Sequence, residues 1–181
     1  MNKFKTIGVF IILIILATLI LSSVRLFEKI EYPKKYDAYI AKYSAEYGVD
    51  KDLMCALIKT ESGFNPEAVS KVGAIGLTQM MEDTFEWTKK KMGDKDTQYQ
   101  DLKDPETSIK YGTYLMSLHL TEYGNTEVAL AAYHAGRSNV NKWLGDGTIS
   151  LEGKVEKLPI DATQHYIKKV MIAYRVYQKD N

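Results

Sequence analysis

Glu61 is an acidic residue in an unusual position on a predicted helix. Leu57 and Ile58 precede it by four and three residues, and helical periodicity puts all three on one face, with Met54 a further turn back. Glu61 therefore continues an apolar stripe, and it does so at the C-terminal end of the helix. Burial and the negative end of the helix dipole both disfavour a charged carboxylate, so we expect a raised pKa and a carboxyl that can donate a proton near neutral pH. The competing interpretation is a frayed last turn that leaves Glu61 in water.

The segment after Glu61 is rich in small and polar residues. Ser70, Gly73, Gly76 and Gln79 are spread across a predicted loop at residues 64–79. Glycines permit tight turns and allow a ligand to approach the backbone closely. Gln79 carries both a donor and an acceptor, which suits sugar hydroxyls or N-acetyl amides. An ordinary glycine loop is the alternative.

The elements that must position these residues are predicted to be helices. Asp50 caps the helix that carries Glu61, and Gly63 ends it. Asp104 followed by Pro105 marks another helix start, and Asp161 is expected to cap the last one. No segment has the pattern of a strand. The part of the chain after residue 33 is therefore predicted to be a compact all-α domain of about seven helices, which cover residues 34–47, 50–62, 80–92, 104–123, 126–133, 139–144 and 161–177.

The N-terminal segment is apolar enough to cross a membrane. Ile7 to Val24 contains no charged residue and spans roughly 27 Å as a helix, close to the ~30 Å of a bilayer core. A cleaved signal peptide is the alternative, although no A-x-A-like site follows, and no cysteine is present there for a lipoprotein anchor. We therefore expect residues 1–24 to be a membrane anchor, 25–33 a juxtamembrane linker and 34–181 a domain that faces outward.

Composition excludes some classes of function. The net charge is +1, so no broad basic field indicates nucleic acid as a partner. Cys55 is the only cysteine and is expected to be a small buried thiol. His119, His134 and His165 lack metal-ligand spacing, so we expect no metal.

Several blocks of the sequence, in order, resemble the Slt-type lytic transglycosylases, which share a goose-lysozyme-like helical fold. The resemblance covers about residues 36–177. The matching blocks are ALIKTESGFNPEAVS at 56–70, GAIGLTQMM at 73–81, DPETSIKYGTYLM at 104–116, ALAAYHAGRSNVNKWL at 129–144 and LPIDATQHYIKKVMIAY at 158–174.

This resemblance implies a function and a set of site residues. It implies an enzyme that cuts the β-1,4 bond between N-acetylmuramic acid and N-acetylglucosamine in peptidoglycan glycan strands and forms a 1,6-anhydro ring. Glu61 would be the single general acid and base, with no cofactor. The residues implied to contact or hold the substrate are Ser62, Gly76, Gln79, Tyr133, His134 and Tyr166.

Three positions depart from the family pattern. Thr78 stands where Met is usual, His134 where Asn is usual, and Ala162 where Glu is usual. None of them replaces Glu61. They leave the substrate contacts of the blocks at 129–144 and 158–174 open, and with them turnover and specificity.

Two other functions remain as alternatives. A lysozyme-like muramidase would hydrolyse the same bond, but it would need a positioned water and a second carboxylate, for which Asp161 is a distant candidate. A non-catalytic peptidoglycan-binding module of a membrane assembly is the other. In each case we expect a single-pass protein of the bacterial cell membrane, held by residues 7–24, with its domain on the cell-wall side.

Overall fold

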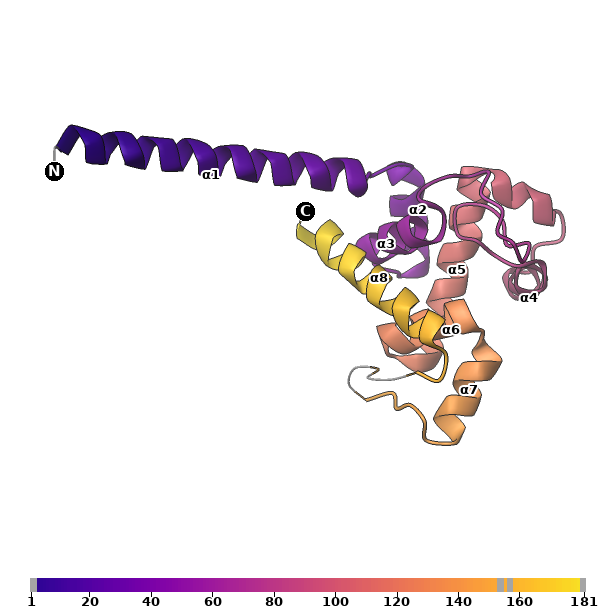
Figure 1. Ribbon diagram of the computed structural model, residues 1–181. Helices are drawn as coiled ribbons and strands as arrows, with labels where there is room; N and C mark the ends of the chain where they lie inside the picture. Colours follow the sequence, from indigo (N-terminus) through magenta and orange to yellow (C-terminus); the bar gives the residue numbers. More distant parts are fainter. Residues whose placement is uncertain (1–2, 153–154, 156–157, 180–181) are drawn as a thin grey trace. The chain divides into compact units, whose positions relative to one another are not determined.

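The computed structural model describes residues 3–152, 155 and 158–179. The chain divides into two compact units, Met1–Pro33 and Lys34–Asn181. The first unit contains one helix, α1 (Lys3–Glu31). The described part of the second unit contains a 3-10 helix, η1 (Tyr99–Lys103), and the helices α2 (Asp37–Tyr47), α3 (Lys51–Ser62), α4 (Glu82–Met92), α5 (Pro105–Tyr123), α6 (Thr126–Ala135), α7 (Arg137–Gly145) and α8 (Asp161–Lys179) (Figure 1).

Helix α1 is long and apolar enough to cross a membrane. Its stretch Phe10–Glu31 has a mean hydropathy of 2.6. The helix continues to Glu31, so most of the segment 25–33 that we expect to be a linker is helical. The reason is local, because residues 25–31 contain neither glycine nor proline, and Pro33 is the first residue that opposes a helix.

The second unit is built from helices packed on helices, which confirms the predicted all-α class. Helix α3 packs chiefly against α8, and the two lie side by side in Figure 1. Helix α5 contacts α2 and α6, while α6 also contacts α7 and α8. Among the described residues no strand forms, and the loop before α4 contains only two isolated bridges, from Ile75 to Val69 and to Met80.

Helix α3 has the ends that its sequence predicts. The Asp50 carboxylate accepts hydrogen bonds from the backbone amides of Asp52 and Leu53 at 2.8 and 3.2 Å. Gly63 ends the helix in the left-handed region at φ 60°. The Tyr174 hydroxyl donates to Asp50 Oδ2 at 2.9 Å, which ties the start of α3 to α8. These contacts fix the direction in which the last turn of α3 points.

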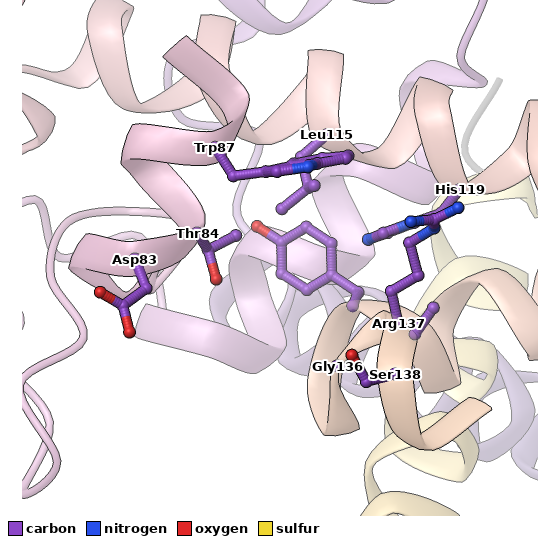
Figure 2. A pocket seen from close by; sticks show the side chains of 10 residues that line it. Asp83, Thr84, Trp87, Leu115, His119, Gly136, Arg137 and Ser138 are labelled. Carbon is purple, nitrogen blue, oxygen red and sulfur yellow. The ribbon is translucent and has the colours of Figure 1, made fainter. Parts of the chain in front are cut away.

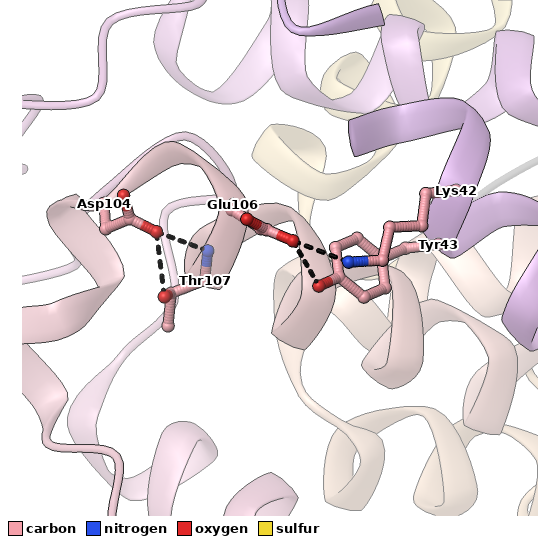
Figure 3. A network of polar contacts seen from close by, with 5 residues as sticks. All are labelled: Lys42, Tyr43, Asp104, Glu106 and Thr107. Atoms are coloured by element: carbon pink, nitrogen blue, oxygen red, sulfur yellow. Dashed lines mark hydrogen bonds and ion pairs between the residues drawn. The ribbon is translucent and has the colours of Figure 1, made fainter. Parts of the chain in front are cut away.

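The N-terminus of α5 is held by two sets of polar contacts (Figure 3). Asp104 caps the helix by accepting from the backbone amide and the hydroxyl of Thr107, both at 2.9 Å. Lys42 Nζ and the Tyr43 hydroxyl, both on α2, donate to Glu106 Oε1 at 2.7 and 2.8 Å. An exposed ion pair adds little to the free energy of unfolding, so the contribution of these contacts is mainly to align α2 with α5.

Several predicted boundaries differ from the structure by a few residues, as at α2, which begins at Asp37 rather than at residue 34. Two differences have a clear physical reason. The helix expected from Met80 begins at Glu82, because the backbone of Met80 exchanges hydrogen bonds with Ile75 at 3.1 and 3.2 Å. The stretch 93–103, expected to be a loop, contains η1, which buries Leu102 completely. A single apolar residue in a polar segment has no periodicity, so the pattern could not reveal this turn.

The loop before α4 rests on an apolar cluster that spans α4, η1 and α5. The cluster consists of Ile75, Met80, Phe85, Leu102, Tyr111 and Leu115. Gly76 makes this packing possible, since it has φ 78° and a Cβ there would lie 2.1 Å from the carbonyl oxygen of Leu102. The loop is therefore seated on the rest of the domain by close packing, opposite the end of α3.

Candidate active site

The last turn of α3 brings Glu61 to a cavity of about 280 Å³. The Glu61 side chain is half-buried, and the Tyr166 hydroxyl on α8 donates a hydrogen bond to its Oε1 at 2.7 Å. Helix α3 remains regular through Ser62, so the frayed turn is not what forms. The cavity is lined by Glu61, Ser70, Val72, Ala74, Gln79, Met80, Met81, Thr84, Leu115, Tyr133 and His134.

The Glu61 carboxyl has the shifted pKa that its position predicts. Burial raises its pKa from 4.5 to about 7, and the hydrogen bond from Tyr166 opposes this rise. At neutral pH the protonated and ionised forms therefore both exist in quantity. A group in that state can donate a proton in one step of a reaction and accept one in the next.

Two tyrosines flank this carboxyl from different helices. Tyr133 on α6 lines the cavity and donates from its hydroxyl to the backbone carbonyl of Thr78 at 2.8 Å. Tyr166 is not among the lining residues of this cavity, and it reaches Glu61 from α8. Burial raises the pKa of both phenols, so both hydroxyls keep their protons and act as hydrogen-bond donors.

Gln79 lines the same cavity in a restricted orientation. Its Nε2 donates to the carbonyl oxygens of Ala68 and Gly76 at 3.0 and 2.9 Å, which uses both amide hydrogens. Its backbone is held at φ 47°, a conformation that side-chain-bearing residues seldom adopt. The carbonyl Oε1 makes no hydrogen bond to any described residue, so Gln79 offers the cavity an acceptor rather than a donor.

Ser62 and Gly76 lie beside the cavity and are not among its described lining residues. Ser62 Oγ donates to the carbonyl of Leu77 at 2.8 Å and also contacts the carbonyl of Ile58. Gly76 accepts from Gln79, and its lack of a side chain allows the close approach to Leu102. Ser62 therefore holds the loop that carries Gln79 against the end of α3, and Gly76 allows the same loop to pack against η1.

The three departures from the family pattern occupy different environments. His134 lines the cavity and contacts Thr163 Oγ1 through Nδ1 at 3.0 Å. Thr78 is fully buried and faces α5, where its Oγ1 lies 3.2 Å from the backbone oxygen of Ser108. Ala162 is exposed in the first turn of α8, next to Asp161, which is also exposed. Of the three, only His134 is placed to touch a ligand in this cavity.

A second cavity of about 260 Å³ adjoins the first. Thr84, Leu115 and Tyr133 line both cavities. Figure 2 shows Trp87 along one side, with His119 and Arg137 at one end and Asp83 at the other. An aromatic face beside hydrogen-bonding side chains is suited to a polar ring such as a sugar. No site role was predicted for Trp87, His119, Arg137 or Asp83. The residue pattern of α4 does not reveal which of its faces lies towards the start of α7.

Neither a reactive thiol nor a metal-binding cluster is found at this site among the described residues. Burial raises the pKa of the Cys55 thiol to about 12, so it is not a nucleophile near neutral pH. His119 is buried and its pKa is lowered to about 4 by that burial, so its ring is neutral. Among the described residues, no group of three or more His, Cys, Asp or Glu side chains is arranged to hold a metal ion.

A helical domain whose cavity holds a carboxyl able to donate and accept a proton has the features of an acid–base enzyme. Comparison with known proteins identifies its family. Residues 38–150 match the transglycosylase SLT domain family. The chain belongs to this family.

Known relatives and solved structures agree with this assignment. The soluble lytic murein transglycosylase of Salmonella typhimurium is 34% identical over 152 residues, which are 82% of this chain and 23% of the relative. The membrane-bound lytic murein transglycosylase C of Yersinia pestis is 33% identical over 171 residues, covering 80% of this chain and 47% of the relative. The chain thus spans less than half the length of either relative.

The fold is that of the soluble lytic transglycosylases. The crystal structure of the 70-kDa soluble lytic transglycosylase from Escherichia coli superposes with a TM-score of 0.77 at 31% identity, over 84% of this chain and 25% of that one. Another structure of this 70-kDa enzyme is its complex with bulgecin A, with the same TM-score. The predicted lysozyme-like helical fold is thereby confirmed.

Proposed function

We propose that this protein is a peptidoglycan lytic transglycosylase that cuts the β-1,4 bond between N-acetylmuramic acid and N-acetylglucosamine. The observation that carries the proposal is the position of Glu61, which lines a cavity of a transglycosylase SLT domain and accepts a hydrogen bond from Tyr166, with its pKa raised by burial. The lytic murein transglycosylases to which the chain is similar support the same substrate.

In the reaction that we propose, one carboxyl moves a proton twice. Protonated Glu61 gives its proton to the glycosidic oxygen, which leaves as the 4-hydroxyl of N-acetylglucosamine. The resulting carboxylate takes the proton of the muramic acid C6 hydroxyl, whose oxygen bonds to the anomeric carbon and closes the 1,6-anhydro ring. Glu61 ends the cycle protonated, and the nucleophile belongs to the substrate, which makes its attack intramolecular.

The composition of the catalytic cavity supports this single-acid reaction. Glu61 is the only carboxyl among the described residues that line it. Retaining and inverting glycosidases instead place two carboxyl groups about the scissile bond. In our proposal Gln79 Oε1 accepts from a hydroxyl or an N-acetyl N–H of the substrate. The second cavity receives the neighbouring sugar of the same strand against Trp87.

Hydrolysis of the same bond is the second candidate, and one observation favours it. Asp83 is a carboxyl group that lines the second cavity, which shares Thr84, Leu115 and Tyr133 with the cavity that Glu61 lines. A muramidase could use this carboxylate to activate a water. Asp83 is absent from the cavity that Glu61 lines, so we rank this reaction below transglycosylation.

The products of digestion distinguish these functions. The full chain in detergent micelles, incubated with purified sacculi, is expected to release muropeptides that end in 1,6-anhydro-muramic acid, as read by mass spectrometry. Glu61→Gln under the same conditions is expected to release none. Reducing ends would instead show the muramidase. An absence of products from the unaltered chain would leave the non-catalytic binding module.

We also propose that α1 anchors the protein in the bacterial cell membrane as a single span, with residues 34–181 on the cell-wall side. The hydropathy and length of α1 support the anchor, as does similarity to a membrane-bound relative. The test is protease treatment of spheroplasts. Residues 34–181 are expected to be degraded from outside, and their protection until the membrane is broken would contradict this orientation.

A further inference from the structure

His134 connects two helices at the edge of the catalytic cavity. Its ring stacks on the ring of Tyr166, with centroids 4.5 Å apart and planes inclined by 28°. Its Nδ1 lies 3.0 Å from the hydroxyl oxygen of Thr163. His134 belongs to α6, whereas Thr163 and Tyr166 are three residues apart on α8 and lie on the same face. The imidazole therefore has two contacts that fix its plane and its rotation.

The tyrosine stacked against this ring, Tyr166, is the residue that donates a hydrogen bond to Glu61. The Tyr166 hydroxyl donates to Glu61 Oε1 at 2.7 Å, and the Tyr166 ring is buried. A phenol can direct its hydroxyl at one oxygen only if both side-chain torsions of the tyrosine are restrained. The stacked His134 ring provides such a restraint on the face that it covers.

We propose that His134 is a positioning residue, whose ring keeps the Tyr166 hydroxyl directed at Glu61. The inference deepens the proposed function, and it rests on that function only in taking Glu61 as the acid. His134 stands where the family usually has Asn. Asn could not fill this role, because it has no ring to stack on Tyr166.

The electrostatic surroundings favour an effect through contact rather than through charge. Burial lowers the pKa of His134, so its ring is neutral at the pH where Glu61 titrates. The other titratable groups that face Glu61 are Tyr133 from α6 and Tyr166 from α8, and both phenols stay protonated. The loop, α4 and α5 contribute only uncharged side chains to this cavity. A change at His134 can therefore reach Glu61 through the orientation of Tyr166.

The proposal predicts how the midpoint of Glu61 titration moves in variants. We would label the full chain with 13C-glutamate in detergent micelles, identify the Glu61 carboxyl signal by its loss in Glu61→Gln, and titrate it by NMR. Tyr166→Phe removes the donor and is expected to raise the midpoint by about one pH unit. His134→Ala and His134→Asn are expected to raise it by about half a unit, because the Tyr166 hydroxyl is then only partly directed.

A matched variant separates the stacked ring from other properties of His134. His134→Phe keeps a ring over Tyr166, so its midpoint is expected to stay at that of the unaltered chain. The double variant His134→Asn with Tyr166→Phe is expected to show no larger shift than Tyr166→Phe alone, because both changes act through one hydrogen bond. Should His134→Ala fail to fold, the His134→Asn and His134→Phe pair gives the same comparison.

Two results would overturn the inference. One is an unmoved midpoint in both His134→Ala and His134→Asn, which would show that His134 does not act on Glu61 through Tyr166. The other is an equal shift in His134→Phe and His134→Asn. The titration is measured without substrate, so its outcome is independent of whether the chain cuts glycan.

Discussion

The Ser62 hydroxyl donates a hydrogen bond to the backbone carbonyl of Leu77 at 2.8 Å, across 15 positions of the sequence. This contact joins the residue that follows Glu61 to the loop that carries Gln79. The acid and the amide acceptor therefore hold their relative positions through a bond that involves neither of their side chains.

We predict that Ser62→Ala weakens both the fold and substrate binding. Loss of the bond to Leu77 is expected to lower the free energy of unfolding by about 1 kcal/mol and to raise KM, because the loop that carries Gln79 is released. Thr60→Ala is the matched control, since the Thr60 hydroxyl bonds only to the carbonyl of Ala56 within α3. Urea denaturation and initial rates would check both variants. A KM that rises equally in the two would contradict the role given to Ser62.

The pH dependence of turnover should follow the Glu61 carboxyl. Only protonated Glu61 can begin the reaction, so kcat/KM is expected to fall as pH rises through about 7, where this carboxyl titrates. The measurement is the initial rate on soluble glycan fragments between about pH 5 and 9. The pH dependence of kcat/KM reports the pKa of the catalytic group in the free enzyme. If kcat/KM does not fall towards the alkaline end of this range, the result contradicts the role of Glu61 as the acid.

Glu61→Gln is expected to stabilise the folded protein, and to do so only above acidic pH. The pKa of Glu61 is raised in the folded state from 4.5 to about 7, so between these values the folded state binds more protons than the unfolded one. The stability of the unaltered chain must therefore decrease as pH rises through this window, by roughly 3 kcal/mol at 1.36 kcal/mol per pKa unit. The neutral amide avoids that loss.

Thermal melts at two pH values would test whether the stability of the unaltered chain decreases as pH rises. The difference in melting temperature between Glu61→Gln and the unaltered chain is expected to be small at about pH 4 and clearly positive at about pH 8. A variant that is less stable at pH 8 than the unaltered chain would show that the carboxylate is stabilised in the fold.

Two glycines in the loop before α4 should respond differently to alanine. At Gly76 a new Cβ would lie 2.1 Å from a backbone oxygen, so Gly76→Ala must displace the loop from η1. Gly73 also has positive φ, but a Cβ there meets nothing within 4 Å. We expect Gly73→Ala to cost about 1 kcal/mol of stability, and Gly76→Ala to cost several times more and to abolish turnover. Equal losses, measured by denaturant unfolding, would contradict the packing described for Gly76.

The parts of this site that local patterns encode could be predicted from the sequence. The half-buried position of Glu61 follows from its spacing to Leu57 and Ile58, and the ends of α3 follow from Asp50 and Gly63, since each depends on neighbours within a few residues. The family resemblance indicated Tyr133, Gln79 and Tyr166, whereas periodicity alone could not distinguish a cleft tyrosine from a core tyrosine.

Features that depend on tertiary contacts could not be predicted. The restriction of Gln79 to an acceptor arises because the carbonyls of Ala68 and Gly76 take both of its amide hydrogens. The second cavity lies between residues of α4, such as Trp87, and residues at the start of α7, such as Arg137. No spacing in the sequence specifies either arrangement.

The central claim is that one carboxyl cuts the glycan strand without a water molecule taking part. The most direct test is digestion of sacculi by the full chain in water enriched in oxygen-18, followed by mass spectrometry of the released ends. The account predicts 1,6-anhydro ends that carry no solvent oxygen, and their complete loss in Glu61→Gln. Heavy oxygen at the new ends, or undiminished release by Glu61→Gln, would contradict it.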